Sequence, residues 1–402
     1  MKLLQKSLEL IENQWKSVHY KTEFLADIGI RIMNEFKFHK ALPKIIDLNL
    51  RSHGAGLPAH GADNIITLAE TPSLLMYLHF WVDGIATPHH HCWDGFFMNL
   101  KGSVIHSIYQ YEEHENLGPN VTFGNLITAK TEILNAGDLV PVYPGKTYIH
   151  GLWHIDYYCL SLSVRAKTKK FSPRELTLDY SKSSGIAIDF TVERPDIIQL
   201  MKWLGMHYEI DRKTYYQIID DIIVSEDATT VFLILNNLVR TFNDLDIMDH
   251  VSEQDYNIDA TLSEHYKNFL KSLVKDEIFT GIRLNVEDFE LRGLYGALYL
   301  SKGKEDFFKI LAQLFPKTSG IKKAEELLYQ ATLTPILQES RPILKDAFRT
   351  YLICILSNHT HSEGIQGIKT EEKLSERETE QLLYTVNSLY ESIIFRPLFH
   401  PN

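Results

Sequence analysis

Short apolar runs separated by glycine and proline fill residues 65–164, and this pattern constrains the fold more than any other feature of the sequence. Residues 73–82 and 157–164 are apolar runs of strand length, and Gly137 with Asp138 forms one of the turn pairs between such runs. Several short strands at close spacing are typical of a β-sandwich or a small antiparallel barrel. We therefore predict a β-rich domain here.

Helical periodicity replaces this pattern on both sides. Residues 1–50 repeat apolar side chains at helical spacing, beginning with Leu8 and Ile11, and residues 197–204 and 379–394 do the same. The chain has 402 residues, more than the roughly 250–300 at which a single core stops growing. The sequence therefore predicts an α+β protein with more than one domain.

We expect three parts along the chain: an N-terminal helical segment over 1–60, a β-barrel over 61–170 that carries the candidate site, and an all-α domain over 171–402. The second boundary follows from the change of pattern after Val164 and the polar stretch 167–170. No fixed-period repeat identifies the helical part as a solenoid. We expect it to pack as a scaffold, to cover the barrel, or to form a homodimer interface.

Composition excludes several classes of function. The chain has 41 Lys and Arg against 52 Asp and Glu, a net charge of −11, and no basic face typical of nucleic-acid binding. No run reaches the roughly 18 apolar residues of a membrane span. Cys92, Cys159 and Cys354 are too few and too scattered for a disulfide framework. We expect a cytoplasmic protein that acts on a small molecule, without nucleic-acid or membrane partners.

The most informative chemical feature is the run Thr87-Pro88-His89-His90-His91. Residues i and i+2 of a strand share a face, so His89 and His91 can point to one side while His90 points to the other. Pro88 suits the first residue of a strand. Two neutral imidazoles that converge in this way suit iron, zinc, copper or nickel.

The order of glycines and histidines in this region resembles the two motifs of the metal-binding cupin family. The residues that match the first motif are Gly84, His89, His91 and Gly102, and those that match the second are Gly137, Pro144, Gly145 and His150. The resemblance covers residues 65–166, roughly a quarter of the chain. It implies a jelly-roll β-barrel with a metal ion held by His89, His91 and His150.

One family feature is absent. The cupin glutamate ligand would fall at Gly95 or Phe96, and neither can ligate a metal through its side chain. An all-histidine site is similar to that of thiol dioxygenases and a few related cupin oxygenases. The same departure also fits a cupin that holds no metal, so both readings remain open.

His150 and His154 compete for the third ligand position. Four residues apart on a strand, they share a face but lie about 13 Å apart at roughly 3.3 Å per residue, so both cannot bind one ion. His150 follows the Pro144-Gly145 turn, as the second motif requires. We predict that His150 is the ligand and that His154 is a catalytic or pocket residue beside the ligands.

Other side chains of the region are candidates for a pocket or for the barrel core. His79 and His106 lie on neighbouring predicted strands. Cys92 directly follows His91, so we expect a packed thiol. Aromatic pocket candidates are Trp93, Phe97, Tyr148 and Trp153, and charged candidates are Asp94 and Lys101.

The resemblance implies a non-haem iron oxygenase or oxidase that uses dioxygen and a small anionic substrate. Iron(II) is preferred through the family, while zinc, manganese, nickel or copper suit histidine ligands as well. Two alternatives stay open. One is a non-catalytic cupin that binds or senses a ligand, and the other is a zinc- or manganese-dependent isomerase or hydrolase.

Overall fold

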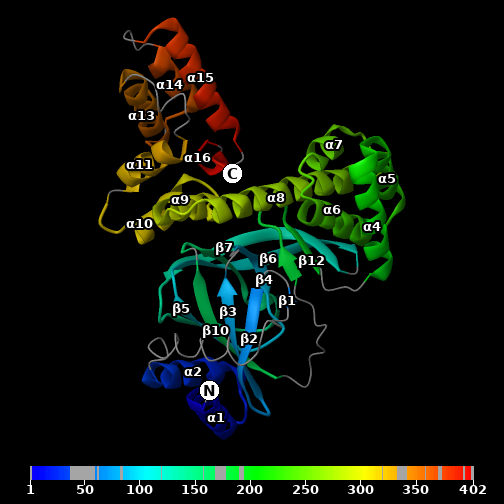
Figure 1. Cartoon of the computed structure of the whole chain (residues 1–402), viewed down its shortest axis with the longest axis vertical. Helices are drawn as coiled ribbons and strands as arrows, with labels where there is room; N and C mark the ends of the chain where they lie inside the picture. Colours follow the sequence, from blue (N-terminus) through cyan, green and yellow to red (C-terminus); the bar gives the residue numbers. More distant parts are fainter. Residues whose placement is uncertain are drawn as a thin grey trace. The chain divides into compact units, whose positions relative to one another are not determined.

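The computed structural model forms two compact units, Met1–Gly281 and Ile282–Asn402, which we describe separately (Figure 1). The described residues are 2–36, 59–60, 63–81, 85–118, 120–156, 158–167, 178–189, 194–318, 320–332, 342–357, 359–369, 374–392 and 394–399. Gly84 of the first predicted motif, residues 37–50 of the predicted helical segment and residues 168–170 of the polar stretch lie outside them.

The first unit begins with two helices that cover an antiparallel sheet (Figure 1). The helices are α1 (Lys2–Ser17) and α2 (Thr22–Phe36). The strands, in spatial order, are β1 (Ala59–His60), β2 (Asp63–Glu70), β3 (Leu74–Trp81), β10 (Cys159–Ala166), β5 (Gly95–Lys101) and β8 (Leu139–Val142). Leu8 and Ile11 of α1 share one buried cluster with Met76 and Leu78 of β3. Burying a side chain of this size stabilises the fold by about 1.5–3 kcal/mol.

The remaining strands of the unit form a closed antiparallel barrel. Its strands, in spatial order, are β11 (Leu178–Tyr180), β12 (Ile186–Asp189), β7 (Val121–Leu134), β6 (Val104–Gly118), β9 (Ile149–His154) and β4 (Ile85–His90). The pair Asp179 and His89 joins β11 to β4 and closes it. Five of the strands contribute to one buried cluster, Tyr109, Leu126, Ile149, Tyr180 and Ala187. We infer that this cluster fills the barrel.

A second apolar cluster joins the open sheet to the barrel. Phe97 and Val142 come from the open sheet, while Val104 and Leu152 come from barrel strands β6 and β9. Side chains on a strand alternate between its faces. On β9, Leu152 faces the open sheet, whereas Ile149, three residues earlier and on the opposite face, belongs to the barrel cluster. The candidate site lies in the layer between the two sheets, as described below.

Helices pack against barrel residues Val121, Ile186 and Ile188. They are α4 (Pro195–Ile210), α5 (Arg212–Ser225), α6 (Ala228–Phe242), α7 (Ile247–Glu253) and α8 (Ala260–Asn285). Asp227 caps α6 by accepting a hydrogen bond from the Thr230 amide. The helix predicted over residues 197–204 is confirmed as part of α4.

The second unit is helical throughout its described residues. After the end of α8 it contains α9 (Phe289–Leu300), α10 (Lys304–Leu314), α11 (Gly320–Thr332), α13 (Pro342–Leu356), α14 (His361–Lys369), α15 (Glu376–Glu391) and α16 (Arg396–Phe399). A capping box between Ser375 and Glu378 begins α15. None of the described helices combines the length and the hydropathy needed to cross a membrane.

The predicted α+β composition is confirmed at the level of antiparallel sheets, a closed six-stranded barrel and helices. Strands β11 and β12 follow residue 170 and complete the barrel, so the region predicted as all-α begins with two short strands. The jelly-roll connectivity and the domain boundaries at 60 and 170 stay predictions.

Candidate metal centre

The first predicted motif lies on β4 and the residue that follows it. A bulge interrupts the pairing of β4 with β9 between Ala86 and His89, after which His89 pairs with His150. His91 comes just beyond the strand, and its carbonyl accepts a hydrogen bond from the Gly145 amide at 2.7 Å. Gly145, in the turn of the second predicted motif, therefore fixes the backbone of His91 at the end of the first motif.

His90 points to the other side, as the alternation predicts. Its Nδ1 lies 2.8 Å from the Tyr180 hydroxyl, and the His90 side chain is buried. Tyr180 belongs to the cluster assigned to the barrel interior. His90 is therefore a packed core histidine, separated from its two neighbours in sequence.

His89, His91 and His150 come together, with one ring nitrogen from each lying within 4.8 Å of the other two. The Nε2 atoms of His91 and His150 are 2.9 Å apart. His150 is buried, while His89 and His91 are partly exposed. The His150 ring lies 5.8 Å from that of Phe97 on β5, which places the cluster between the open sheet and the barrel.

The donor set fits a transition-metal ion. Metal–nitrogen bonds are about 2.0–2.1 Å long, so two nitrogens on one ion lie at most about 4.2 Å apart. At the tetrahedral angle the separation is about 3.4 Å, so the widest pair would have to close by up to about 1.4 Å, which side-chain rotations can supply. Within the described residues the cluster holds three histidines and no carboxylate.

Burial favours the neutral form of His91 and His150. Desolvation, followed by the neighbouring histidines, holds the pKa values of His91 and His150 well below their usual range. His89 Nδ1 lies 2.8 Å from the Thr87 carbonyl, which can only accept, so His89 Nδ1 donates and Nε2 is the ring nitrogen left to bind a metal. Neutral imidazoles with free lone pairs are the form that binds metal.

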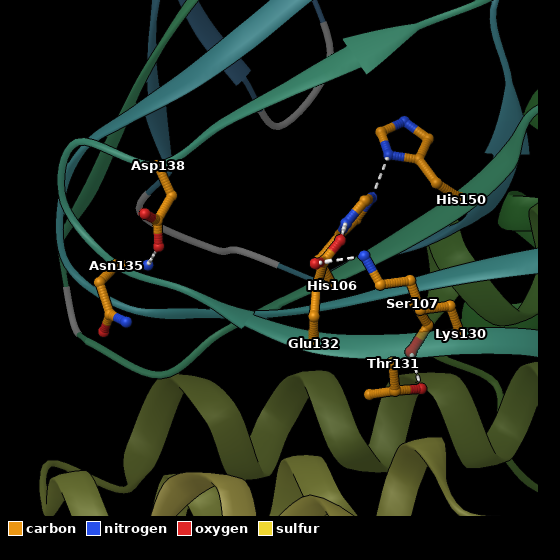
Figure 2. Close-up of polar contacts among 8 residues, drawn as sticks. All are labelled: His106, Ser107, Lys130, Thr131, Glu132, Asn135, Asp138 and His150. Carbon is orange, nitrogen blue, oxygen red and sulfur yellow. Dashed lines mark hydrogen bonds and ion pairs between the residues drawn. The ribbon is translucent and has the colours of Figure 1, made fainter.

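A hydrogen-bonded chain runs outward from His150 (Figure 2). His106 Nε2 lies 3.1 Å from His150 Nδ1, and His106 Nδ1 lies 3.2 Å from Glu132 Oε1. Lys130 donates to the other Glu132 oxygen at 2.6 Å. The His106 hydrogen bond, assisted by Lys130, lowers the pKa of Glu132 to about 2, so this carboxylate is ionised.

Glu132 was missed in the sequence, and His106 was only a pocket candidate. The two residues pair directly across β6 and β7. The register of that hairpin shifts at three bulges, so counting residues back from the turn does not predict the pair. Side chains alternate between the two faces of a strand, so following this alternation along residues 121–134 could have identified Glu132 as a polar side chain on the same face as its neighbours two positions away.

The predicted residues His79 and His154 belong to a second aromatic group. The Trp81 ring stacks on both, at 5.7 Å from His79 and 4.7 Å from His154. His79 Nε2 lies 2.8 Å from the Ser163 hydroxyl. Burial, with Arg165 second, lowers the pKa of His79 to about 3. Neither histidine joins the three-histidine cluster, and a catalytic role for His154 stays a prediction.

Trp93 and Arg165 connect the two groups. The Trp93 ring lies 4.5 Å from that of His91, and the Arg165 guanidinium lies over Trp93 at 4.4 Å from the ring centre. Arg165 also lies 3.3 Å from His79 Nε2. The positive charge of Arg165 is thus separated from His91 of the histidine cluster by the Trp93 ring alone.

The other predicted candidates divide between the site and the core. Phe97 and Tyr148 contact the His150 ring, at 5.8 and 5.2 Å between ring centres. Trp153 is fully buried against Phe279 of α8 and is a core residue. Lys101 is exposed, Asp94 is buried with a pKa raised by burial to about 6, and the Cys92 thiol is half-buried.

Comparison with known proteins leaves the family open. No family model matches the chain, and no curated protein matches it. Among solved structures, it is similar to KdgF from Halomonas sp. (15% identity, 28% of this chain and 86% of that one, TM-score 0.21). It is also similar to hydroquinone 1,2-dioxygenase from Sphingomonas sp. TTNP3 (8% identity, 27% and 67%, TM-score 0.21). A third likeness is to an oxalate oxidase in complex with glycolate (14% identity, 29% and 57%, TM-score 0.20). Scores this low establish neither a fold family nor an activity for this chain.

Proposed function

We propose that the chain binds one transition-metal ion through His89, His91 and His150 and acts as a cupin-type oxygenase or oxidase on a small anionic molecule. The observation that carries the proposal is the convergence of three ring nitrogens within 4.8 Å. Their position between two sheets supports it, because the rings of Phe97 and Tyr148 pack against the His150 ring and give the site an apolar wall.

The donor set itself favours an anionic substrate. Three neutral histidines leave the charge of a divalent ion uncompensated, whereas a carboxylate ligand would reduce it. Arg165, close to His91 through Trp93, adds positive charge on the same side. A carboxylate, thiolate or enolate is therefore the substrate group that suits this site.

Iron(II) is the metal that we propose, and the cupin resemblance of the two motifs is the reason for preferring it. When bound, such an ion would supply open positions where substrate and dioxygen meet. Zinc, manganese, nickel and copper accept imidazole ligands too. The chain's own residues bind the metal through the three imidazoles and line its surroundings with Phe97 and Tyr148.

The test begins with elemental analysis of protein purified without chelator. Wild type should carry close to one metal ion per chain, while His89→Ala and His91→Ala should carry almost none. The matched control is His114→Ala, an exposed histidine on the same strand as His106, which should keep the metal. Equal metal in the His91→Ala and wild-type proteins would overturn the site.

Oxygen-electrode assays then test the reaction. Oxygen uptake should require both iron(II) and an anionic substrate from a panel of thiols, keto acids and amino acids, and should vanish in His91→Ala. Full iron occupancy without uptake across the panel would favour a binding or sensing protein. Zinc that iron cannot functionally replace would exclude an oxygenase.

A further inference from the structure

The chain from His150 through His106 to Glu132 constrains where hydrogens lie in the site. Each link is a hydrogen bond between side chains, and the three residues come from the adjacent strands β9, β6 and β7 (Figure 2). His106 is fully buried, whereas the Glu132 carboxylate is 26% exposed and bonded to Lys130. The chain thus joins a buried candidate ligand to an ionised group at the edge of the barrel.

The Glu132 carboxylate determines which atom carries the hydrogen in its bond with His106. An ionised Glu132 can only accept, so His106 Nδ1 must carry the hydrogen of their bond. A neutral His106 then offers a lone pair at Nε2, and His150 Nδ1 must supply the hydrogen of the next bond. His150 is left with its lone pair at Nε2, the atom that faces His91.

The other arrangement would place a doubly protonated His106 between Glu132 and His150. That form would donate to His150 Nδ1 and move the His150 hydrogen to Nε2, where it would block a metal. A charged imidazole without water contact is costly. Glu132 already shares its charge with Lys130, which weakens the support it could give to that cation. The neutral chain is therefore the favoured one.

We infer that Glu132 and His106 are positioning residues that hold His150 in the tautomer and orientation that bind metal. This inference rests on the proposed function, because it assigns His150 as a ligand. Partners of this kind behind a ligating histidine typically contribute about 10–100-fold in metal affinity.

The same reasoning locates the hydrogen in the contact between His91 and His150. With a lone pair at His150 Nε2, the 2.9 Å contact between the two Nε2 atoms needs a hydrogen on His91 Nε2. If His91 binds the metal through Nε2, this ring hydrogen has to leave that atom when the metal binds. His150 already presents its ligand atom.

Metal affinity tests the positioning pair, using zinc and a chromophoric competitor. Glu132→Ala should weaken zinc binding about 10–100-fold. Glu132→Gln keeps an acceptor oxygen for His106 Nδ1 and should lose less. Glu112→Ala removes an exposed carboxylate from the paired strand β6 and serves as the matched control, so it should bind zinc within about threefold of wild type. Unchanged affinity in Glu132→Ala would overturn the inference.

His106 variants separate positioning from packing. His106→Gln can accept from His150 Nδ1 through its amide oxygen, whereas His106→Leu fills the space without an acceptor. We expect the Gln variant to retain more zinc affinity than the Leu variant. Equal affinities would show that His106 only fills space, which would overturn its role.

Nitrogen NMR of histidine-labelled, metal-free protein gives a readout that packing alone would not move. Wild type should show His150 with its hydrogen on Nδ1, and the Glu132→Ala protein should lose that preference. If wild type binds no metal but shows this tautomer, the metal site fails and the positioning of His150 stands. If wild type binds zinc with His150 protonated at Nε2 in the metal-free form, the positioning inference fails and the site stands.

Discussion

Replacing Gly29 with alanine should destabilise the first unit, because α2 meets the Phe96 ring of β5 at this glycine. A Cβ on residue 29 would lie 2.0 Å from Phe96 Cε1 and 2.4 Å from Cζ. Ordinary contacts between carbon atoms are about 3.5–4.0 Å, so the ring would have to retreat by more than about 1 Å. Phe96 is completely buried beneath the N-terminal helices, so space for that movement is lacking.

The magnitude follows from two opposing effects. Overpacking a buried contact costs about 1–3 kcal/mol. Alanine in place of glycine within a helix returns about 0.5–1 kcal/mol of that cost. We therefore expect a net loss of about 1.2 kcal/mol in the free energy of unfolding, within bounds of about 0 and 2.5 kcal/mol.

Denaturant titration, with the slope compared between variants, measures this loss. Gly281→Ala in α8 is the control, because a Cβ there meets nothing within 4 Å, and it should leave stability unchanged or raise it. Combining Gly29→Ala with Phe96→Leu should cost less than the sum of the two single changes. A Gly29→Ala protein as stable as wild type would refute the close approach of α2 to β5.

Two further predictions concern the histidines around Trp81. His154→Ala should keep its metal and lose about 10–100-fold in activity or substrate affinity, and metal loss in His154→Ala but not in His150→Ala would reverse the assigned roles. Because burial lowers the pKa of His79 from 6.5 to about 3, the unfolded chain binds more protons in that interval, and stability should fall as the pH drops below 6.5. The loss is about 1.4 kcal/mol per pH unit for this one group. Denaturation of metal-free His79→Gln at several pH values should show a shallower slope than wild type, and equal slopes would contradict the assignment.

Local patterns in the sequence were sufficient for the secondary structure near the site. The apolar run at 73–82 became β3, and the turn pair Gly137-Asp138 precedes β8. The alternation of His89, His90 and His91 placed the middle residue on the other side, where it bonds Tyr180. These predictions succeeded because the direction of a side chain along a strand depends on its neighbours in sequence.

Predictions that depended on pairing between distant segments were incomplete. Closure of the barrel by Asp179 and His89 joins residues 90 positions apart, and no local pattern signalled β11. The grouping of His79 with His154 through the Trp81 ring, which stacks on both, was not predicted either. Such placements follow from how whole sheets pack.

The sequence by itself determined the candidate ligands His89, His91 and His150 and the strands and turn that carry them, because motif order and strand alternation are local properties. Only the tertiary structure decided that His106 and Glu132 stand behind His150. Strand register, bulges and the packing of two sheets place those side chains, and these depend on contacts across the whole unit.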